Sequence, residues 1–405
     1  MQTKINKVSA EGGGVVNVPE GEYIVNKTLY LKSNVHLRGA GTGKTIFKIK
    51  TKVRNKSSEY KILTSDRATN VQVSNITFDG LKEKRADKIN SPNAHTIVFS
   101  YVNGFKISNI EVKNSASSSI ALYNSKNGVI ENNKIKDSGS NGILGLQKIN
   151  DVKVLNNYIN KIRNQNGIFF MYQDGKSSSN ILIEGNEIKN VADYAIEVGH
   201  TTQKPKDPPH TNIIVKNNRI ENAFCTGIGF RTVSNGLIEN NKIKGYSQHH
   251  GYGCNGIFVE GRVMLNENVD VKNNEIIQTY PNIDGEYPYQ QAIYITGMDN
   301  MDITKNYIKD SWSDSIYILA SYFKGKTPEF PNGRRVYKNI HVIKNTIVNS
   351  EFSGIHFDDY NSSGNLVKSN FIFNSGKYGI EIEGKRNRVK VFLANRLGDI
   401  NSKTD

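Results

Sequence analysis

The sequence predicts a right-handed, single-stranded parallel β-helix, an all-β solenoid of about 12 coils with a short N-terminal cap. Three observations predict it: an asparagine motif that recurs along the chain, short alternating segments that begin with isoleucine, and turns rich in asparagine and glycine. Alternation with period two is typical of strands, and strands this short bury their apolar faces only when successive coils stack. The Leu-x-x-Leu-x-Leu frame of a leucine-rich repeat is missing.

The recurring motif is Asn-x-Ile, or Asn-x-x-Ile where the asparagine is doubled. We expect its asparagines to hydrogen-bond along one corner of the stack. They are Asn75, Asn109, Asn133, Asn157, Asn186, Asn218, Asn241, Asn274, Asn306, Asn345 and Asn370. The shortest intervals, such as 23 residues from Asn218 to Asn241, define the bare coil.

One domain is expected over residues 1–405, because 35 glycines and only 9 prolines do not suggest separate units joined by linkers. Residues 1–14 are expected to be the remnant of a cap, about 15–397 the coils, and 398–405 a tail. Open solenoid ends expose strand edges, which is why a cap is expected.

The formal net charge of +15 favours an anionic partner. Basic residues such as Lys134 and Lys136 are scattered through turns, so nucleic acid is not the expected partner. No apolar run is long enough to cross a membrane, and the first residues do not form a signal-peptide core. An extracellular or virion-associated location would then require unusual export or a leader already removed. Cys225 and Cys254 lie at equivalent places in adjacent coils, which permits a disulfide without demanding one.

Insertions beyond the bare coil gather in the second half of the chain and flank one strand of each coil. The main ones are residues 203–210, 246–254, 281–290 and 321–335. Two walls of loops along one face predict a groove whose floor is formed by that strand. Insertions without a function are the alternative.

Two clusters of titratable residues are expected to point outward into the groove, because the residue after each inward isoleucine faces out. The first comprises Glu197, His200, Arg231 and Glu260, with His249 and His250 in a loop. A cation beside carboxylates and imidazoles suits proton abstraction next to a sugar carboxylate. A surface ladder of salt bridges without function is the alternative.

The second cluster comprises His356, Asp358, Glu381 and Glu383, beside Tyr317. It is interpreted as a solvated face, with cation binding as the alternative. Outward aromatic residues predict stacking on sugar rings, and they are Phe169, Tyr172, Phe258, Tyr294 and Tyr317. For Phe169 and Phe258 the alternative is a satellite core beneath the inserted loops.

The opening tract through Gly12-Gly13-Gly14 and Arg38-Gly39 resembles the pectate-lyase-like β-helix superfamily. This superfamily includes polysaccharide lyases, glycosidases, mannuronan C5-epimerases and phage tailspikes. The segment Tyr194-Ala195-Ile196-Glu197-Val198-Gly199-His200 resembles the active-site strand of the C5-epimerases. The resemblance implies catalytic roles for Tyr194, Glu197, His200 and either His249 or His250. The family's Asp-Pro-His-Glu-Gln run is absent, Glu197 replaces its aspartate, and His200 lies one residue late.

The leading functional prediction is an enzyme that abstracts the proton beside the carboxylate of an acidic polysaccharide, as a β-elimination lyase or a C5-epimerase. His356 and Asp358 are expected to join the aromatic residues in substrate binding, and Arg231 to neutralise the uronate. One alternative is a glycoside hydrolase that uses Glu197 and Glu260. Another is a non-catalytic phage spike or surface adhesin, which would be a monomer or, as a spike, a homotrimer. No cofactor or metal is expected, with Ca²⁺ left open.

Overall fold

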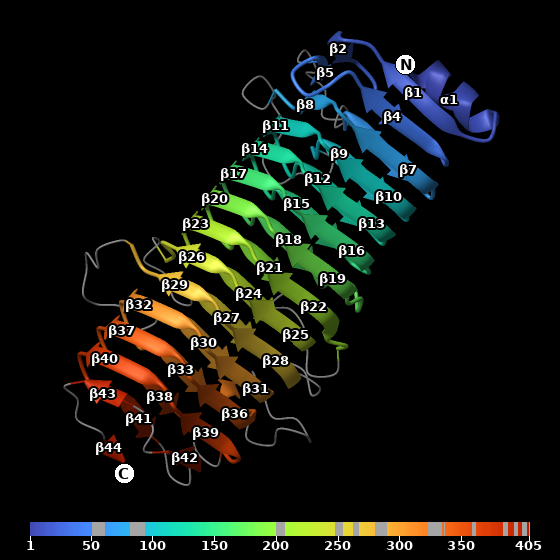
Figure 1. Cartoon of the computed structure of the whole chain (residues 1–405). Coiled ribbons are helices and arrows are strands. Elements are labelled where there is room, and N and C mark those ends of the chain that lie inside the picture. The colour runs from blue at the N-terminus through green and yellow to red at the C-terminus, as the bar shows by residue number, and fades with distance from the viewer. Residues whose placement is uncertain are drawn as a thin grey trace. The chain divides into compact units, whose positions relative to one another are not determined.

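The computed structural model describes residues 1–50, 61–81, 94–199, 207–247, 254–261, 267–279, 290–322, 334–335, 337–358, 362–383, 388–392, 396–398 and 403–404. The chain divides into two compact units, Met1–Asp193 and Tyr194–Asp405. Within each unit, strands from successive coils form three parallel sheets (Figure 1). This confirms the predicted right-handed parallel β-helix.

The first unit opens with helix α1 (Gln2–Ala10) and continues as strands. Its first sheet contains β1 (Gly14–Val18), β4 (Val35–Gly39), β7 (Thr69–Ser74), β10 (Asn103–Ser108), β13 (Lys126–Glu131), β16 (Asn150–Leu155) and β19 (Ser179–Glu184). Its second sheet contains β2 (Gly21–Val25), β5 (Thr45–Ile49), β8 (Thr77–Asp79), β11 (Glu111–Ser115), β14 (Lys134–Ser138), β17 (Tyr158–Ile162) and β20 (Glu187–Val191). Its third sheet contains β3 (Leu29–Tyr30), β6 (Leu63–Asp66), β9 (Ile97–Ser100), β12 (Ile120–Tyr123), β15 (Ile143–Leu146) and β18 (Ile168–Met171).

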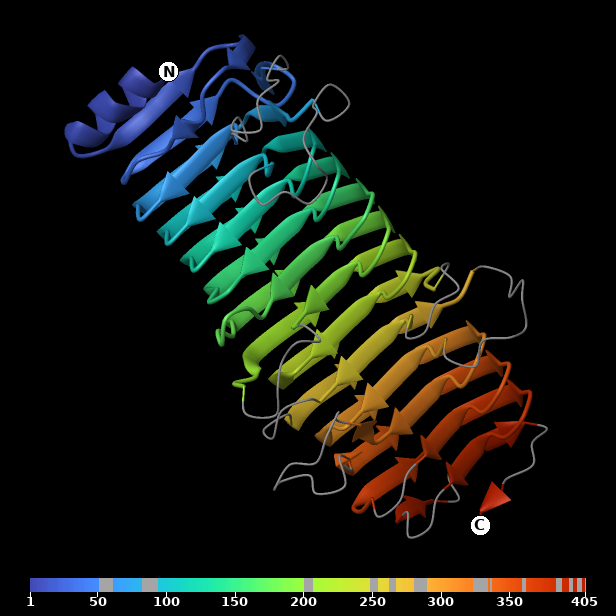
Figure 2. The same ribbon diagram turned by 180° about the vertical axis from the view of Figure 1, so that it is seen from behind.

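The second unit repeats this arrangement, which Figure 2 shows from behind. Its first sheet contains β22 (His210–Lys216), β25 (Val233–Glu239), β28 (Glu267–Lys272), β31 (Asp299–Thr304), β36 (Lys338–Ile343), β39 (Asn365–Lys368) and β42 (Val389–Val391). Its second contains β23 (Arg219–Ala223), β26 (Lys242–Lys244), β29 (Glu275–Ile277), β32 (Tyr307–Ser311), β37 (Thr346–Ser350), β40 (Phe371–Ser375) and β43 (Arg396–Gly398). Its third contains β21 (Ile196–Val198), β24 (Ile228–Arg231), β27 (Ile257–Glu260), β30 (Ile293–Thr296), β33 (Ile316–Leu319), β38 (Ile355–Asp358), β41 (Ile380–Glu383) and β44 (Lys403–Thr404). An antiparallel pair, β34 (Ser321–Tyr322) and β35 (Arg334–Arg335), completes the unit.

The number of coils is larger than the sequence predicts. Counting both units, the first sheets hold 14 strands, whereas about 12 coils were expected from the motif. Strands β1 and β4 come before Asn75 and carry no asparagine motif, so the repeat does not reveal them. Strand β44 lies in the segment expected to be a tail.

Isoleucine stacks set the register of the third sheet in each unit. In the first unit, Ile97, Ile120, Ile143 and Ile168 pair coil by coil and are fully buried. In the second unit the corresponding stack is Ile196, Ile228, Ile257, Ile293, Ile316, Ile355 and Ile380. Because strand side chains alternate, burying each isoleucine turns the next residue to the outer face.

An asparagine ladder supports the coils, but the predicted register of its first two members is wrong. Asn133 donates to Asn157, and Asn157 donates to Asn186, at 3.0 and 2.9 Å. In the second unit the ladder runs through Asn218, Asn241, Asn274, Asn306, Asn345 and Asn370.

Asn75 and Asn109 have positive φ angles of 58° and 53° and lie one residue before the ladder position. Isoleucines 76 and 110 occupy the buried place instead. Neither asparagine is doubled. Each takes the left-handed place that Asn132 takes in the pair Asn132-Asn133, and isoleucine follows where the ladder asparagine would stand.

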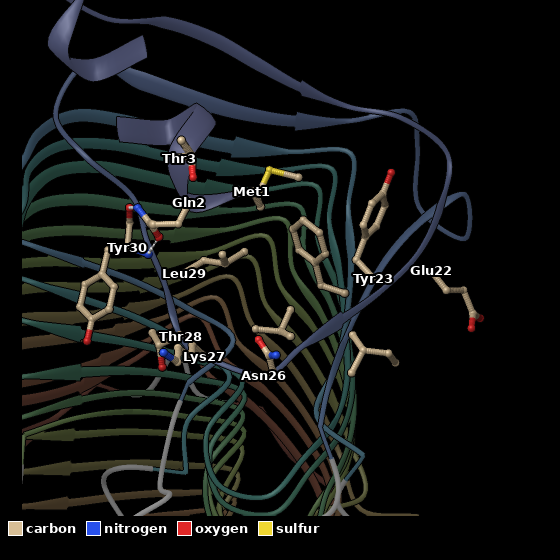
Figure 3. A pocket seen from close by; sticks show the side chains of 13 residues that line it. Met1, Gln2, Thr3, Glu22, Tyr23, Asn26, Lys27, Thr28, Leu29 and Tyr30 are labelled. Carbon is tan, nitrogen blue, oxygen red and sulfur yellow. Dashed lines mark hydrogen bonds between the residues drawn. The ribbon is translucent and has the colours of Figure 1, made fainter. Parts of the chain in front are cut away.

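The N-terminal helix is tied to the first coils through Gln2. The Gln2 Nε2 donates to the carbonyl of Tyr30 at 2.9 Å, and the Tyr30 N–H donates to the Gln2 Oε1 at 2.8 Å. A cavity of about 940 Å³ lies beside this contact, lined by residues 1–3, 22–30 and Phe47 (Figure 3). Among the described residues that line the cavity, Glu22 is the one carboxylate. In the described ranges, no helix combines the length and apolar character that a bilayer span needs.

A disulfide joins Cys225 to Cys254 in the second unit, so the pairing that the sequence permits is present. The two cysteines come shortly before β24 and β27, the strands that carry Arg231 and Glu260. The bond therefore fastens two adjacent coils next to the candidate site.

The ladder leads to a stability prediction. Asn274 is 1% exposed; its Oδ1 accepts from Asn241, and its Nδ2 donates to the Ile238 carbonyl and to Asn306. Replacing Asn274 with alanine leaves these buried groups without partners, and we expect the free energy of unfolding to fall by about 3 kcal/mol. Chemical denaturation followed by circular dichroism measures the change.

The neighbouring Asn273 supplies the matched control. Its φ angle is 55°, a conformation that glycine adopts without strain, so Asn273→Gly should change the free energy of unfolding by less than about 0.5 kcal/mol. Equal losses in the two variants would show that the ladder adds nothing to stability.

Candidate functional site

The outer face of the third sheet in the second unit carries the candidate site. Strand pairing aligns one outward column in the predicted register: Glu197, Gly229, Phe258, Tyr294, Tyr317, His356 and Glu381. The second column also has the predicted register: Arg231, Glu260, Thr296, Leu319, Asp358 and Glu383. Adjacent members are about 4.8 Å apart through the backbone, so side chains from neighbouring coils meet. His200, His249 and His250 lie outside the described residues.

Arg231 is the centre of the first cluster. Its Nε donates to the Glu197 Oε1 at 3.1 Å, and its Nη1 donates to the Glu260 Oε2 at 2.8 Å. Its Nη2 donates to the phenol oxygen of Tyr194 at 2.5 Å. One guanidinium therefore binds two carboxylates and a phenol, which come from both neighbouring coils.

Aromatic rings enclose this guanidinium. Its carbon lies 4.7 Å from the ring centre of Phe258 and 5.5 Å from that of Tyr194. The Tyr194 ring lies over Gly229, where an added Cβ would come within 2.5 Å of it. The side chains of Arg231, Glu197 and Glu260 are 13%, 8% and 10% exposed. This is a buried ion cluster, unlike the solvated salt-bridge ladder considered from the sequence.

The electrostatics of the cluster favour a charged Arg231. Burial by itself lowers the pKa of Arg231, but the facing oxygens of Tyr194, Glu260 and Glu197 outweigh burial and raise the pKa above its usual range. The guanidinium therefore stays protonated at any physiological pH. This permanent cation is in direct contact with the phenol oxygen of Tyr194.

An aromatic row continues from the Arg231 cluster along the same column. The Phe258 and Tyr294 ring centres are 5.5 Å apart, and the Tyr294 and Tyr317 rings stack at 5.5 Å with an angle of 16°. Tyr317 in turn lies 4.8 Å from the imidazole of His356. Phe258 is 5% exposed, whereas Tyr294 and Tyr317 are half-buried. The two tyrosines therefore present partly accessible ring surface.

The two remaining predicted aromatic residues belong to the first unit. Phe169 packs with Val98, Ala121 and Leu144 in an apolar cluster on the outer face of the third sheet. Tyr172 is 6% exposed. Both side chains are buried, as in the satellite-core alternative considered for Phe169.

His356 is the centre of the second cluster. Its Nδ1 lies 3.2 Å from the Asp314 Oδ2 and 3.8 Å from the Glu381 Oε2, and its Nε2 lies 3.9 Å from the Glu383 Oε2. His356 and Glu381 are 8% and 2% exposed. The interpretation of this cluster as a solvated face is therefore wrong for His356 and Glu381, although Glu383 is exposed.

Hydrogen bonds from neighbouring side chains hold two acidic groups of the second cluster, Asp358 and Glu381. The Tyr317 hydroxyl donates to the Asp358 Oδ2 at 2.7 Å. The Ser353 hydroxyl donates to the Glu381 Oε2 at 2.5 Å, and Lys377 donates to the other Glu381 oxygen. Glu381 is thus held on both oxygens by neighbouring side chains.

These contacts shift three pKa values. Burial alone lowers the pKa of His356, but the hydrogen bond with Asp314 and nearby carboxylates raise it above its usual value. Burial raises the pKa of Glu381, yet the bonds from Lys377 and Ser353 bring it below its usual value. The bond with Glu381, together with burial, raises the pKa of Glu383.

The sequence reasoning missed Asp314, Ser353 and Lys377. Asp314 lies two residues before the inward isoleucine of its strand, as Tyr194 does in its own coil. This shared offset places a side chain at the turn that enters the third sheet. Polar residues two positions before the inward isoleucine were the signal from which Asp314 could have been identified.

The fold places this chain in the class of parallel β-helix proteins. On its outer face, a row of aromatic rings lies between two acidic clusters. The chain matches the family described as the right handed beta helix region over residues 57–206, 176–330 and 209–395. It belongs to that right-handed β-helix family, as the superfamily resemblance implied.

Two relatives of known sequence differ in how much of the chain they match. The chain is 24% identical to plasmin and fibronectin-binding protein A of Streptococcus pneumoniae, over 97% of the chain and 57% of the relative. It is 32% identical to the mannuronan C5-epimerase AlgE1 of Azotobacter vinelandii, over 22% of the chain and 7% of that protein. The chain thus spans little more than half the length of the first relative.

Solved structures support the fold. The A-module of the A. vinelandii epimerase AlgE6 has a TM-score of 0.59 at 16% identity, covering 99% of this chain and 94% of the module. The S. pneumoniae surface adhesin PfbA has a TM-score of 0.59 at 17% identity, covering 94% and 87% of the two chains. The catalytic unit of a GH87 α-1,3-glucanase from Streptomyces thermodiastaticus also reaches 0.59 at 16% identity, covering 98% and 66%. The same solenoid is therefore shared by enzymes and an adhesin.

The buried ion cluster leads to a second prediction. Arg231→Met leaves Glu197 and Glu260 without their shared cation, and we expect the free energy of unfolding to fall by about 3 kcal/mol. Neutralising both carboxylates as well, in an E197Q/R231M/E260Q variant, should restore most of that loss because no uncompensated charge remains buried. Denaturant titration of the three proteins gives the comparison.

Arg219 provides the control, because its ion pair with Glu221 is largely exposed, with 57% and 23% of the side chains accessible. Arg219→Met should cost less than about 1 kcal/mol. Similar losses for the two arginines would argue against a buried, coupled cluster at Arg231.

Proposed function

We propose that this protein is a carbohydrate-active β-helix whose second unit binds an acidic polysaccharide along the aromatic row and abstracts the proton beside the uronate carboxylate. The observation that carries the proposal is the position of the Tyr194–Arg231 pair next to one end of the row formed by Phe258, Tyr294 and Tyr317. Stacking surface and a candidate base therefore share one face of the sheet.

The aromatic row suits a linear sugar polymer. Its rings follow one another at 5.5 Å, and Tyr294 and Tyr317 keep part of their surface accessible. Sugar C–H groups bind to such surfaces because the apolar area of the ring is removed from water. Tyr294 is central in the row and is assigned as the main stacking residue.

Proton transfer is assigned to Tyr194. Its phenolate, stabilised by the Arg231 guanidinium, takes the proton from C5 of a uronate, and the electron pair of that C–H bond moves toward the carboxylate. The oxygen at C4 then leaves with its electron pair and takes a proton from the Tyr194 phenol or from water, which gives an unsaturated sugar. Return of a proton from water to the opposite face of C5 instead gives the epimer, with C4 unchanged.

Arg231 has a different part in this proposal from the one predicted. Glu197 and Glu260 already bind its guanidinium. Arg231 is therefore assigned to stabilising the Tyr194 phenolate and not to neutralising the uronate. The same contact weighs against hydrolysis by Glu197 and Glu260, because Arg231 fills the space where an inverting enzyme keeps its water. The geometry therefore favours proton abstraction over hydrolysis at this cluster.

A non-catalytic surface adhesin is the second candidate, and the extent of similarity favours it. The likeness to plasmin and fibronectin-binding protein A extends over 97% of the chain, whereas the likeness to AlgE1 extends over 22%. This candidate binds polysaccharide or host protein through the same outer face without turnover. The similarity to a surface adhesin also supports an extracellular location in either case.

The third prediction tests turnover. The protein is incubated in D₂O with alginate, pectate and glycosaminoglycans, and both the ultraviolet absorbance of unsaturated products and deuterium at C5 are followed. Absorbance identifies a lyase, and deuterium without absorbance identifies an epimerase. Tyr194→Phe should lower the active signal by about 100-fold or more, because it removes the acid–base group but keeps the ring.

Tyr307→Phe is the matched control, since Tyr307 is an exposed tyrosine on the second sheet. Tyr294→Ala should raise KM more than it lowers kcat. Binding of a polysaccharide, fibronectin or plasmin with no turnover of any polymer would replace the enzymatic proposal with the adhesin.

A further inference from the structure

We propose that His356, Asp358 and Glu383 form a binding site for one divalent transition-metal ion, such as Zn²⁺ or Mn²⁺. The ligands are the His356 Nε2 and one carboxylate oxygen from each acidic residue. This inference does not depend on polysaccharide turnover, because it concerns metal binding by the chain itself.

Strand register brings the three ligands together. His356 and Asp358 project from the same face of β38, and Glu383 lies opposite Asp358 on β41. The three candidate ligand atoms lie within 4.8 Å of one another, and the His356 Nε2 lies 3.9 Å from the Glu383 Oε2. Bonds of about 2.1 Å place the ligands of a tetrahedral ion about 3.4 Å apart, so small side-chain rotations close the site.

The His356 Nε2 is the observation that points to a ligand. The residue is 8% exposed, and the Nε2 atom is buried with no hydrogen-bond partner among the residues that the structure describes. An unpaired imidazole nitrogen is costly in such a position unless it has another partner. The carboxylates of Asp358 and Glu383 lie in the same cluster, and together with a neutral imidazole nitrogen they make a donor set for a transition metal.

The opposite nitrogen of the same ring is already engaged. The His356 Nδ1 lies 3.2 Å from Asp314, whose other oxygen accepts from the Ser353 N–H at 2.8 Å. Glu381 on that side accepts from Ser353 and Lys377. The Nδ1 side is thus closed by protein contacts, and the geometry assigns the ion to the Nε2 side.

The surrounding contacts are those that orient metal ligands. A carboxylate on the second nitrogen fixes the tautomer that leaves Nε2 free to coordinate, and Asp314 supplies it. The Tyr317 hydroxyl holds Asp358 at 2.7 Å, and its ring packs against the imidazole at 4.8 Å. Two of the three ligands are therefore oriented before an ion arrives.

Charge and donor type select the ion. With neutral His356, the described part of the cluster holds four carboxylates, Asp314, Asp358, Glu381 and Glu383, against the ammonium of Lys377. A divalent ion brings this excess of negative charge close to balance. Ca²⁺ prefers an all-oxygen set, whereas Zn²⁺ and Mn²⁺ accept a nitrogen with two carboxylates and keep positions open for water or substrate.

The fourth prediction is metal binding by the full chain. After treatment with a chelator and its removal, Zn²⁺ and Mn²⁺ are titrated by calorimetry in a mildly alkaline buffer, with Ca²⁺ and Mg²⁺ in parallel. One transition-metal ion per chain should bind. His356→Gln and Glu383→Gln should each weaken it at least about 100-fold, and Asp314→Asn by about 10- to 100-fold through loss of orientation.

His341 is the matched control, because its Nδ1 also pairs with a carboxylate, Asp302, at 3.0 Å on a more exposed surface. His341→Gln should leave the affinity unchanged. Glu383 is exposed, so Glu383→Gln keeps the fold and tests the site even if the His356 variant is unstable. Equal loss in His341→Gln and His356→Gln, preference for Ca²⁺, or no bound transition metal would overturn the proposal.

Discussion

The pairing register of the third sheet is the constraint on which the rest of the second unit depends. From β21 to β41, each strand of this sheet buries one isoleucine at its start, and the residue after it is forced to the outer face. A slip of one residue would bury the titratable side chains and expose the isoleucines, so the apolar stack fixes the chemistry above it. The ladder from Asn218 to Asn370 reinforces the same alignment at another corner of each coil. The same strand register therefore stabilises the second unit and positions the side chains of the candidate site.

Stacking converts single residues into a continuous surface. Side chains on the outer face of successive coils come into contact, so aromatic rings pack on rings and a guanidinium packs on a ring. The row from Phe258 to His356 takes one ring from each of four successive coils, so no single coil could build it. Its ends differ because Arg231 closes one of them with a buried cation, whereas carboxylates around His356 dominate the other. A linear ligand lying on this row would therefore meet different chemistry at its two ends.

Sequence periodicity predicts the features that recur from coil to coil and misses residues that occur in a single coil. The fold, the outward columns and the contacts of Arg231 with Glu197 and Glu260 all follow from counting residues after an isoleucine. Counting asparagines does not separate the left-handed position from the ladder position that follows it, because a single asparagine such as Asn75 can stand at the first of them. It also missed Asp314 and Lys377, which enter the second cluster from turns outside the strand. Burial of His356 and Glu381 depends on these turn residues, which is why a solvated face was the wrong interpretation.

The candidate site carries an excess of negative charge, whereas the chain as a whole is positively charged. The protein is formally +15, yet the described side chains around the row include Glu197, Glu260, Asp314, Asp358, Glu381 and Glu383 against Arg231 and Lys377. Two like charges at short distance repel unless a cation lies between them. A uronate polymer on this row must therefore bring or find a counter-ion near the His356 end, where the acidic excess is greatest. A divalent ion held by His356, Asp358 and Glu383 would meet that need, because it offsets the protein carboxylates and leaves coordination positions for an anionic sugar.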